Sequence, residues 1–266
     1  MYQFNYLRPQ SLAEAASQLA SLDDPKLIAG GQTLIPTLKQ RLAMPSDLID
    51  ISALHELSFI RAEGDAVTIG AATPHADVAT SAVLRQSIPA LADLASHIGD
   101  PAVRHRGTLG GSIANNDPAA DYPAACLALD AKIHTTGRLI EADKFFTGMF
   151  ETALQPGEII REVTFPHPEK AAYAKFPNPA SRYAMVGVFV AKGPWGIRVA
   201  VTGAGQNGVF RCEELEAALA RNWSPESVAA IRISPEGINS DLHGTAAYRA
   251  HLITVMAKRA VTATLA

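Results

Sequence analysis

Residues 107–112 read Gly-Thr-Leu-Gly-Gly-Ser, and together with Ala29-Gly30-Gly31-Gln32-Thr33 they are the most informative pattern in this chain of 266 residues. Paired glycines let a backbone approach a ligand closely, and successive amide N–H groups form a concave anion site of the kind that suits a pyrophosphate. Two such loops could hold a diphosphate from both sides. The alternative interpretation is two tight turns that need a positive φ.

The residues around the second glycine motif are unusually polar. Ser112, Asn115, Asn116, Asp117 and Asp121 offer side chains that could bond ribityl, ribose or ring groups of a cofactor. For Asn116 and Asp117 an Asx-turn and helix cap is the alternative, because both residue types bond nearby backbone readily. The basic run at residues 103–106 could place charge near a diphosphate or face a partner chain, with a solvated surface as the alternative.

Outward from these motifs, the chain has an α+β pattern. Ser11 and Glu14 form a capping box that predicts a helix over residues 12–22, and a strand at 26–29 leads through the first glycine pair into a helix that Pro36 opens. Further helices are expected at 89–98, 122–129, 213–220 and 246–265, and strands at 47–51, 57–61, 66–71, 132–136, 138–141, 159–165, 185–191 and 197–202. The four prolines at 166, 168, 177 and 179 predict a linker or a long loop, which places a boundary near residue 170.

Composition and charge narrow the functional classes. With 48% hydrophobic and 18% charged residues the chain is globular, and a net charge of −3 argues against nucleic acid as a partner. No apolar run approaches the roughly 20 residues of a membrane span, and the first residues lack a secretory signal, so we expect a cytoplasmic protein.

Several kinds of chemistry have no support in the sequence. Cys126 and Cys212 are too few for an iron–sulfur cluster, and the eight histidines show no metal-ligand spacing, so we expect no metal ligand in this chain. Residues 203–208 match G-x-G-x-x-G, but strand-like residues follow and no βαβ unit surrounds them, so a loop between strands is expected. Signatures of hydrolysis and phosphoryl transfer are missing, and we expect no catalytic residue.

With these motifs in this order, the chain resembles the FAD-binding medium subunits of molybdenum hydroxylases. That family includes the flavoprotein subunit of aerobic carbon monoxide dehydrogenase and the flavin domain of xanthine dehydrogenase. The resemblance covers nearly the whole chain and rests on residues 2–15, 29–36, 107–112, 117–124, 157–160, 175, 180–184 and 241–249. Gln32-Thr33 stands where the carbon monoxide enzyme has His-Ser, which keeps the hydrogen-bonding role. The cysteine-rich insert of one reductase branch is absent.

The resemblance implies a vanillyl-alcohol-oxidase or p-cresol-methylhydroxylase-type FAD-binding fold. A FAD-binding domain would span residues 1–170, with subdomains at about 1–55 and 56–170, and a C-terminal sheet-plus-helix domain would span 171–266. The implied cofactor-binding residues are Ala29, Gly30, Gly31, Gln32, Thr33, Leu34, Thr108, Leu109, Gly110, Gly111, Ser112, Asn115, Asp121, Ile160, Lys175 and Tyr183. Among relatives, the position of Ile160 lies near the adenine, that of Lys175 near the flavin, and that of Tyr183 over the isoalloxazine ring.

The resemblance also implies a role in electron transfer. A large subunit would hydroxylate the substrate at a molybdenum cofactor, a small subunit would relay electrons through two 2Fe–2S clusters, and FAD on this chain would pass them to an external acceptor. The implied assembly is a dimer of heterotrimers. The alternatives are a stand-alone flavoprotein oxidoreductase of the same fold and a flavin-free structural subunit.

Overall fold

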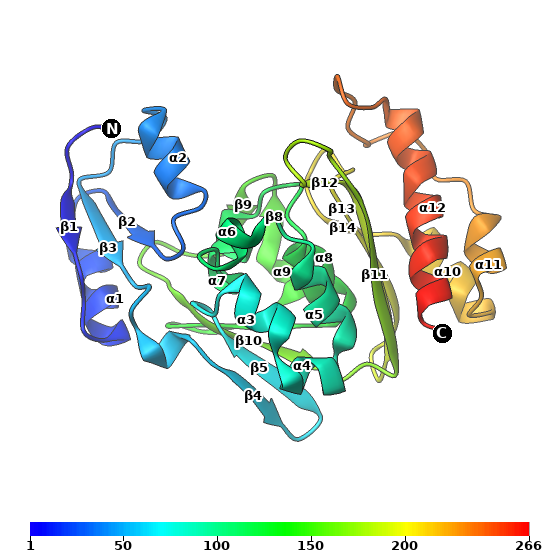
Figure 1. Cartoon of the computed structure of the whole chain (residues 1–266), viewed down its shortest axis with the longest axis horizontal. Helices are drawn as coiled ribbons and strands as arrows, with labels where there is room; N and C mark the ends of the chain where they lie inside the picture. The colour runs from blue at the N-terminus through cyan, green and yellow to red at the C-terminus, as the bar shows by residue number, and fades with distance from the viewer. Residues whose placement is uncertain (266) are drawn as a thin grey trace.

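The computed structural model describes residues 1–265, and three β-sheets succeed one another along the chain (Figure 1). The first belongs to a separate N-terminal lobe, drawn in blue. The second lies in the middle of the molecule, and the third, with the C-terminal helices, lies at the opposite end from the lobe. A two-stranded ribbon of β8 (Phe146–Gly148) and β9 (Glu151–Thr152) completes the strands.

The N-terminal lobe is built on a parallel sheet in the order β1-β3-β2. Its strands are β1 (Asn5–Leu7), β2 (Pro25–Ile28) and β3 (Asp47–Asp50), and its helices are α1 (Leu12–Ser21) and α2 (Leu34–Lys39). Helix α1 begins where the capping box predicts, because the Ser11 side chain accepts a hydrogen bond from the Glu14 amide. The loop from β2 to α2 carries the first glycine pair, so the sheet edge positions it.

The middle sheet is antiparallel with the order β4-β5-β10-β6-β7. Its strands are β4 (Ile60–Glu63), β5 (Ala66–Gly70), β6 (Lys132–Thr135), β7 (Leu139–Glu141) and β10 (Ile160–Pro166). Its helices are α3 (His75–Thr80), α4 (Ala82–Ser87), α5 (Pro89–Ser96), α6 (Pro101–Arg104), α7 (Leu109–Asn115), α8 (Tyr122–Ala128) and α9 (Ala142–Phe145). Strand β10 pairs with both β5 and β6, and so joins segments about 90 and 30 residues earlier in the chain.

The C-terminal sheet is antiparallel and is covered on both faces. It consists of β11 (Lys170–Pro177), β12 (Ala184–Gly193), β13 (Gly196–Thr202) and β14 (Phe210–Arg211). Helices α5 and α8 pack on one face, and α10 (Glu213–Arg221) and α12 (Ala246–Ala263) pack on the other, with α11 (Pro225–Ala229) beside α12. This double cover explains why β12 is apolar and buried along nearly its whole length.

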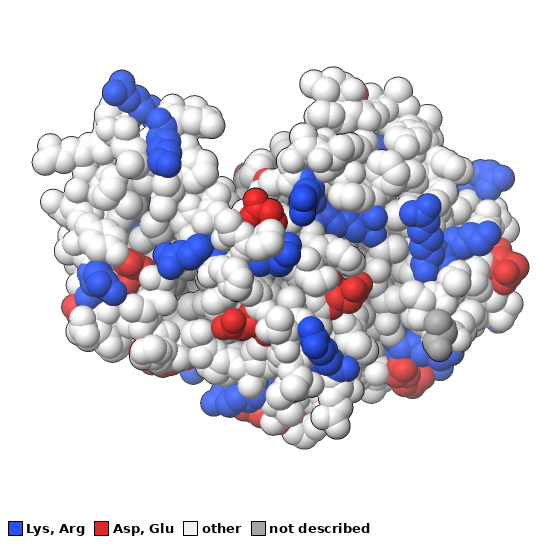
Figure 2. All heavy atoms as spheres, in the orientation of Figure 1, with Lys and Arg blue, Asp and Glu red and all other residues white. Residues whose placement is uncertain are grey.

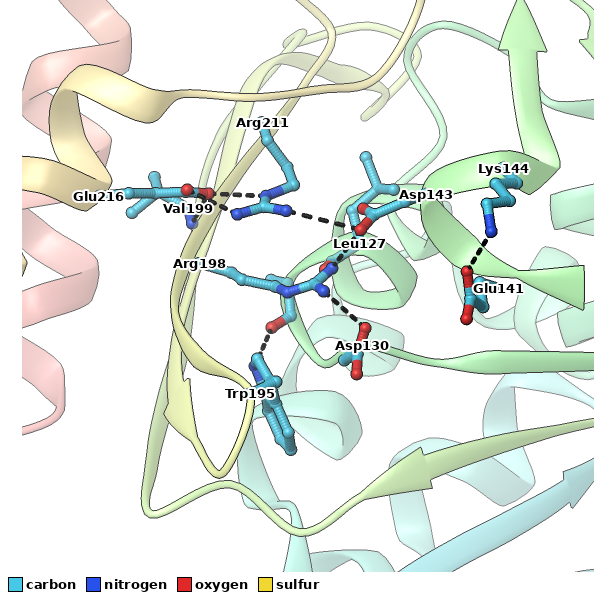
Figure 3. A network of polar contacts seen from close by, with 11 residues as sticks. Leu127, Asp130, Glu141, Asp143, Lys144, Trp195, Arg198, Val199, Arg211 and Glu216 are labelled. Atoms are coloured by element: carbon cyan, nitrogen blue, oxygen red, sulfur yellow. Dashed lines mark hydrogen bonds and ion pairs between the residues drawn. The ribbon is translucent and has the colours of Figure 1, made fainter.

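An ionic network ties the C-terminal sheet to the middle of the molecule (Figure 3). Arg198 of β13 donates to Asp130 at 2.6 Å and to Asp143 of α9 at 2.9 Å. Arg211 of β14 pairs with the same Asp143 at 3.5 Å and donates to Glu216 of α10 at 2.7 Å. The Arg198 side chain is only 11% exposed, so this network is a partly buried clamp between the two sheets.

Three predicted elements are wrong in detail. The proline-rich segment is largely strand β11 rather than a long loop, and Pro166 and Pro177 stand at strand ends, where a missing N–H is tolerated. Helix α2 begins at Leu34, two residues before Pro36. Pro36 is tolerated there because the N–H groups of the whole first turn have no intrahelical acceptor, so a missing N–H breaks no hydrogen bond. Residues 55–57 form a 3₁₀ turn, and β4 begins only at Ile60.

The helices α3, α4, α6, α7, α9 and α11 are not predicted from the sequence. They are four to seven residues long, which is too short for a periodic apolar face to be recognised. No helix within residues 1–265 has both the length and the apolar character that a membrane span requires.

Candidate functional site

A cavity of about 650 Å³ lies between the N-terminal lobe and the rest of the chain, where Figure 2 shows the surface deeply hollowed. Residues 26–34 supply the lobe wall. The opposite wall comes from residues between 71 and 121, with further contributions from 158–160 and 181–183. A volume of this size is typical of sites that enclose cofactors and other small molecules.

The first glycine motif presents free backbone donors to this cavity. The amide N–H groups of Gly30, Gly31, Gln32 and Thr33 donate to no backbone carbonyl of residues 1–265. Gly31 has φ +70°, a left-handed conformation that glycine adopts without strain. A run of unpaired N–H groups on a cavity wall can bind an anion, so this loop has the property that its sequence predicts.

The second glycine motif has a different structure from the one expected. Thr108 caps α7 by accepting a hydrogen bond from the Gly111 amide, and Gly110 lies in the first turn of that helix with no positive φ. The amides of residues 109–112 already donate to Thr73, Ala71 and Thr108. The expectation of a second set of free amides is therefore wrong, because the helix start and the neighbouring chain use these donors.

Glycine is nevertheless required where the two motifs meet. A Cβ on Gly30 would collide with the carbonyl oxygen of Arg106 and would lie 2.7 Å from the Cα of Gly107. A Cβ on Gly110 would lie 2.6 Å from the Cβ of Ala71. Both distances are far below the normal separation of carbon atoms. Gly30 therefore allows the lobe to approach residues 106–107, and Gly110 allows α7 to approach Ala71 within the middle of the chain.

A buried ion pair supports the cavity wall at Asp121. Its carboxylate accepts from Lys175 Nζ at 2.9 Å and from the Tyr173 hydroxyl, and both members of the ion pair are 5% exposed. Burial raises the pKa of the Asp121 carboxyl, and the Lys175 ammonium and the Tyr173 hydroxyl oppose that rise. The wall thus contains a fixed, internally compensated pair of charges.

Asn116 and Asp117 are separated by the structure. Asn116 is 1% exposed, has φ 43°, and donates to the carbonyl oxygens of Gly148 and Glu151, so it is a structural helix cap. Asp117 lines the cavity while its carboxylate accepts from the Ala119 amide. Burial raises the pKa of Asp117. Asp117 therefore combines the Asx-turn with a position on the cavity wall.

The cavity brings together all but two of the predicted site residues. Those that line it are Ala29, Gly30, Gly31, Gln32, Thr33, Leu34, Thr108, Gly110, Gly111, Ser112, Asn115, Asp121, Ile160 and Tyr183. Leu109 is instead fully buried in the core, and Lys175 lies behind Asp121. His75, Glu158 and Arg182 also line the cavity. Glu158 and Arg182 lie in segments 157–160 and 180–184, which carry the resemblance, but they are not among the predicted site residues. His75 lies outside every motif, so no local pattern identifies it.

Tyr183 lines the cavity and is 46% exposed as a whole residue. Burial, together with the negative charges of Asp117 and Asp121, raises the pKa of its hydroxyl.

The G-x-G-x-x-G stretch at residues 203–208 connects β13 to β14 and contributes nothing to the cavity wall, so the expectation of a loop between strands is confirmed.

A family model described as the FAD-binding domain in molybdopterin dehydrogenase matches residues 2–168. The chain belongs to this family. The expected family, its oxidoreductase class and FAD as its cofactor are thereby confirmed.

Relatives match this FAD-binding chain over nearly its whole length. The carbon monoxide dehydrogenase medium chain of Hydrogenophaga pseudoflava is 36% identical, with 98% of this chain and 96% of the relative covered. The 6-hydroxypseudooxynicotine dehydrogenase complex subunit alpha of Paenarthrobacter nicotinovorans is also 36% identical, with 96% and 92% covered. One solved structure is carbon monoxide dehydrogenase from Hydrogenophaga pseudoflava, in a form that lacks the Mo-pyranopterin moiety of the molybdenum cofactor. One of its chains superposes on this chain with a TM-score of 0.88 and is 36% identical in sequence, and the match covers 99% of this chain and 97% of that one. The mixed α/β architecture is thus shared with that enzyme.

Proposed function

We propose that this chain is the FAD-carrying electron-transfer subunit of a molybdenum hydroxylase complex. It would receive electrons from the 2Fe–2S clusters of a small partner subunit and pass them to an external acceptor. The observation that carries the proposal is the cavity between two glycine motifs in a chain of this family. A relative named as a medium chain supports small and large partner subunits, and we infer an assembly of two heterotrimers.

The residues of the cavity fit FAD. The free N–H groups from Gly30 to Thr33 suit the diphosphate, because consecutive backbone donors bind phosphate oxygens without added side-chain charge. Gly110 and Gly111 lack side chains, so a ligand can approach the start of α7 closely. The side chains of Ser112 and Asn115 extend the polar wall. When bound, FAD supplies the redox chemistry that no side chain can provide.

The other residues would orient the cofactor and shield it from water. Ile160 offers an apolar surface for the adenine, and Tyr183 offers an aromatic face for the flavin ring at the cavity mouth. Lys175 acts through Asp121, since its ammonium holds that carboxylate in place at 2.9 Å. The chain's task in this mechanism is to bind and orient, and no side chain is required as a general base.

We also propose the finer fold assignment that the resemblance implies. The vanillyl-alcohol-oxidase-type FAD-binding domain would span residues 1–170, divided at about residue 55, and the C-terminal domain would span 171–266. Three observations support this division: the lobe sheet ends at Asp50, the C-terminal sheet begins at Lys170, and the family match ends at residue 168. The cytoplasm remains the predicted compartment.

An absorption spectrum of the purified full chain, with the cofactor released by acid and identified by chromatography, tests the proposal. One FAD per chain is expected. A chain that stays colourless after reconstitution with FAD would support a structural subunit instead. A chain that oxidises a substrate without partner subunits would support a stand-alone flavoprotein. Flavin that the reduced partner subunits fail to reduce would contradict the electron-transfer role.

A further inference from the structure

His75 is a buried histidine on the cavity wall to which no role has been assigned above. It begins α3, is 4% exposed and lines the cavity. Its amide donates to the carbonyl oxygen of Gly107 at 2.9 Å. Its ring packs on the same residue, because a Cβ on Gly107 would lie 2.6 Å from His75 Nε2. His75 therefore lies directly against the segment that leads into the second glycine motif.

The ring of His75 has unused hydrogen-bonding capacity. Nδ1 is buried without a hydrogen-bond partner, and no hydrogen bond within residues 1–265 contributes to the pKa shift of the ring. The neighbouring ring of Tyr122, with its centroid 5.3 Å away, carries a buried hydroxyl that also has no partner. A buried polar atom left unpaired destabilises the folded protein. Two such atoms on neighbouring rings indicate that these side chains make hydrogen bonds to groups outside the polypeptide.

Burial and charge keep the His75 ring neutral, so that one ring nitrogen accepts and the other donates. Burial, with a smaller effect from the Arg104 guanidinium, lowers the pKa of His75 to about 4, so the ring is neutral at pH 7. Burial also raises the pKa of the Tyr122 hydroxyl, which keeps its proton and can donate toward Nδ1 through one bridging water molecule. Nδ1 is then the acceptor. Nε2, on the side of Gly107, carries the proton and is a donor.

We propose that His75 is a cofactor-binding residue whose neutral imidazole donates a hydrogen bond from Nε2 to a diphosphate oxygen of FAD. The inference rests on the proposed function, because it requires FAD in this cavity. It also explains how the second glycine motif can serve an anion although the amides of residues 109–112 already donate within the protein. Side chains can supply donors on that side, and His75 and Ser112 both line the cavity.

Two matched amide variants of the full chain test this inference. In His75→Gln an amide N–H takes the place of Nε2–H, whereas in His75→Asn the amide reaches only the place of Nδ1. Quenching of flavin fluorescence in titrations of the flavin-free protein gives the Kd for FAD and for riboflavin, which lacks the diphosphate. We expect His75→Asn to weaken FAD binding about tenfold, equivalent to about 1.4 kcal/mol. We expect His75→Gln to weaken it less than about threefold, and the Kd for riboflavin to stay unchanged in both.

Each other outcome has a distinct meaning. Equal Kd values for FAD in the unmodified chain and both variants would overturn the role of His75 and leave the proposed function intact. Equal losses for FAD and riboflavin would also overturn it, because the diphosphate would not be involved. An unmodified chain that binds no FAD would overturn the proposed function itself.

A measurement on the unmodified chain does not depend on whether a variant folds. Nitrogen-15 NMR of the histidine rings distinguishes the two neutral tautomers. We expect the His75 ring to carry its proton on Nε2, and the Nε2–H signal to shift when FAD is added. A proton on Nδ1, or a signal that FAD leaves unmoved, would overturn the inference.

Discussion

Replacing Gly30 by alanine tests the contact that joins the two glycine motifs. The added Cβ would collide with the Arg106 carbonyl oxygen and lie 2.7 Å from the Gly107 Cα. Non-bonded carbon atoms prefer about 3.5–4.0 Å, so the two segments must move apart by roughly 1 Å. Overpacking of this kind typically costs about 1–3 kcal/mol. Because backbone atoms cannot turn aside as a side chain can, we expect a loss of about 3 kcal/mol in the free energy of unfolding.

Gly137→Ala is the matched control for this substitution. Its Cβ would meet only the Glu158 Oε1 atom, at an ordinary distance of 3.6 Å. Neither glycine has a positive φ, and both substitutions restrict the unfolded chain equally. Urea unfolding of the flavin-free proteins compares their stability, and titration with FAD compares their affinity. We expect Gly30→Ala to bind FAD at least about tenfold more weakly, and Gly137→Ala to bind it normally. Equal stability and equal affinity in the two variants would refute the importance of this contact.

Three further predictions concern charged and titratable groups. Arg198→Met should lower the free energy of unfolding in urea by about 2 kcal/mol, because it leaves Asp130 without its ion-pair partner and Asp143 with only the longer contact to Arg211. Lys144→Met, at an exposed pair, should have no measurable effect. Lys175→Met should lower the free energy of unfolding by about 3 kcal/mol, because it leaves the buried Asp121 carboxylate uncompensated. Adding Asp121→Asn should restore part of that loss. A double variant no more stable than Lys175→Met alone would contradict the pairing. Folding lowers the pKa of His75 from 6.5 to about 4, so between these pH values the unfolded chain binds a proton that the folded chain does not. The free energy of unfolding should therefore fall by up to roughly 3 kcal/mol as the pH drops through that range. Urea unfolding at several pH values should show a shallower decline in His75→Gln, and an unchanged slope would contradict this.

Much of the fold follows from local patterns in the sequence. The capping box at Ser11, the hairpin at residues 132–141 and the apolar run of β12 all have short-range signals, because caps, turns and side-chain alternation depend on neighbouring residues. The prolines near residue 170 mislead, since proline disfavours the interior of a strand but is tolerated at its ends. Whether such a segment is a loop or a strand depends on its pairing with β12, the next strand along the chain, and the prolines themselves do not indicate that pairing.

The candidate site divides in the same way between sequence and tertiary structure. The sequence by itself determined where the two glycine motifs lie, because backbone freedom at glycine is a property of single residues. It also determined the family of the chain, and the family gives the cofactor. Only the tertiary structure decided that the first motif keeps its amides free while the second donates to Ala71 and Thr73. It alone places Lys175 behind Asp121 and His75 against Gly107. Hydrogen-bond partners and burial are set by contacts between residues far apart in the chain, and a linear pattern does not contain them.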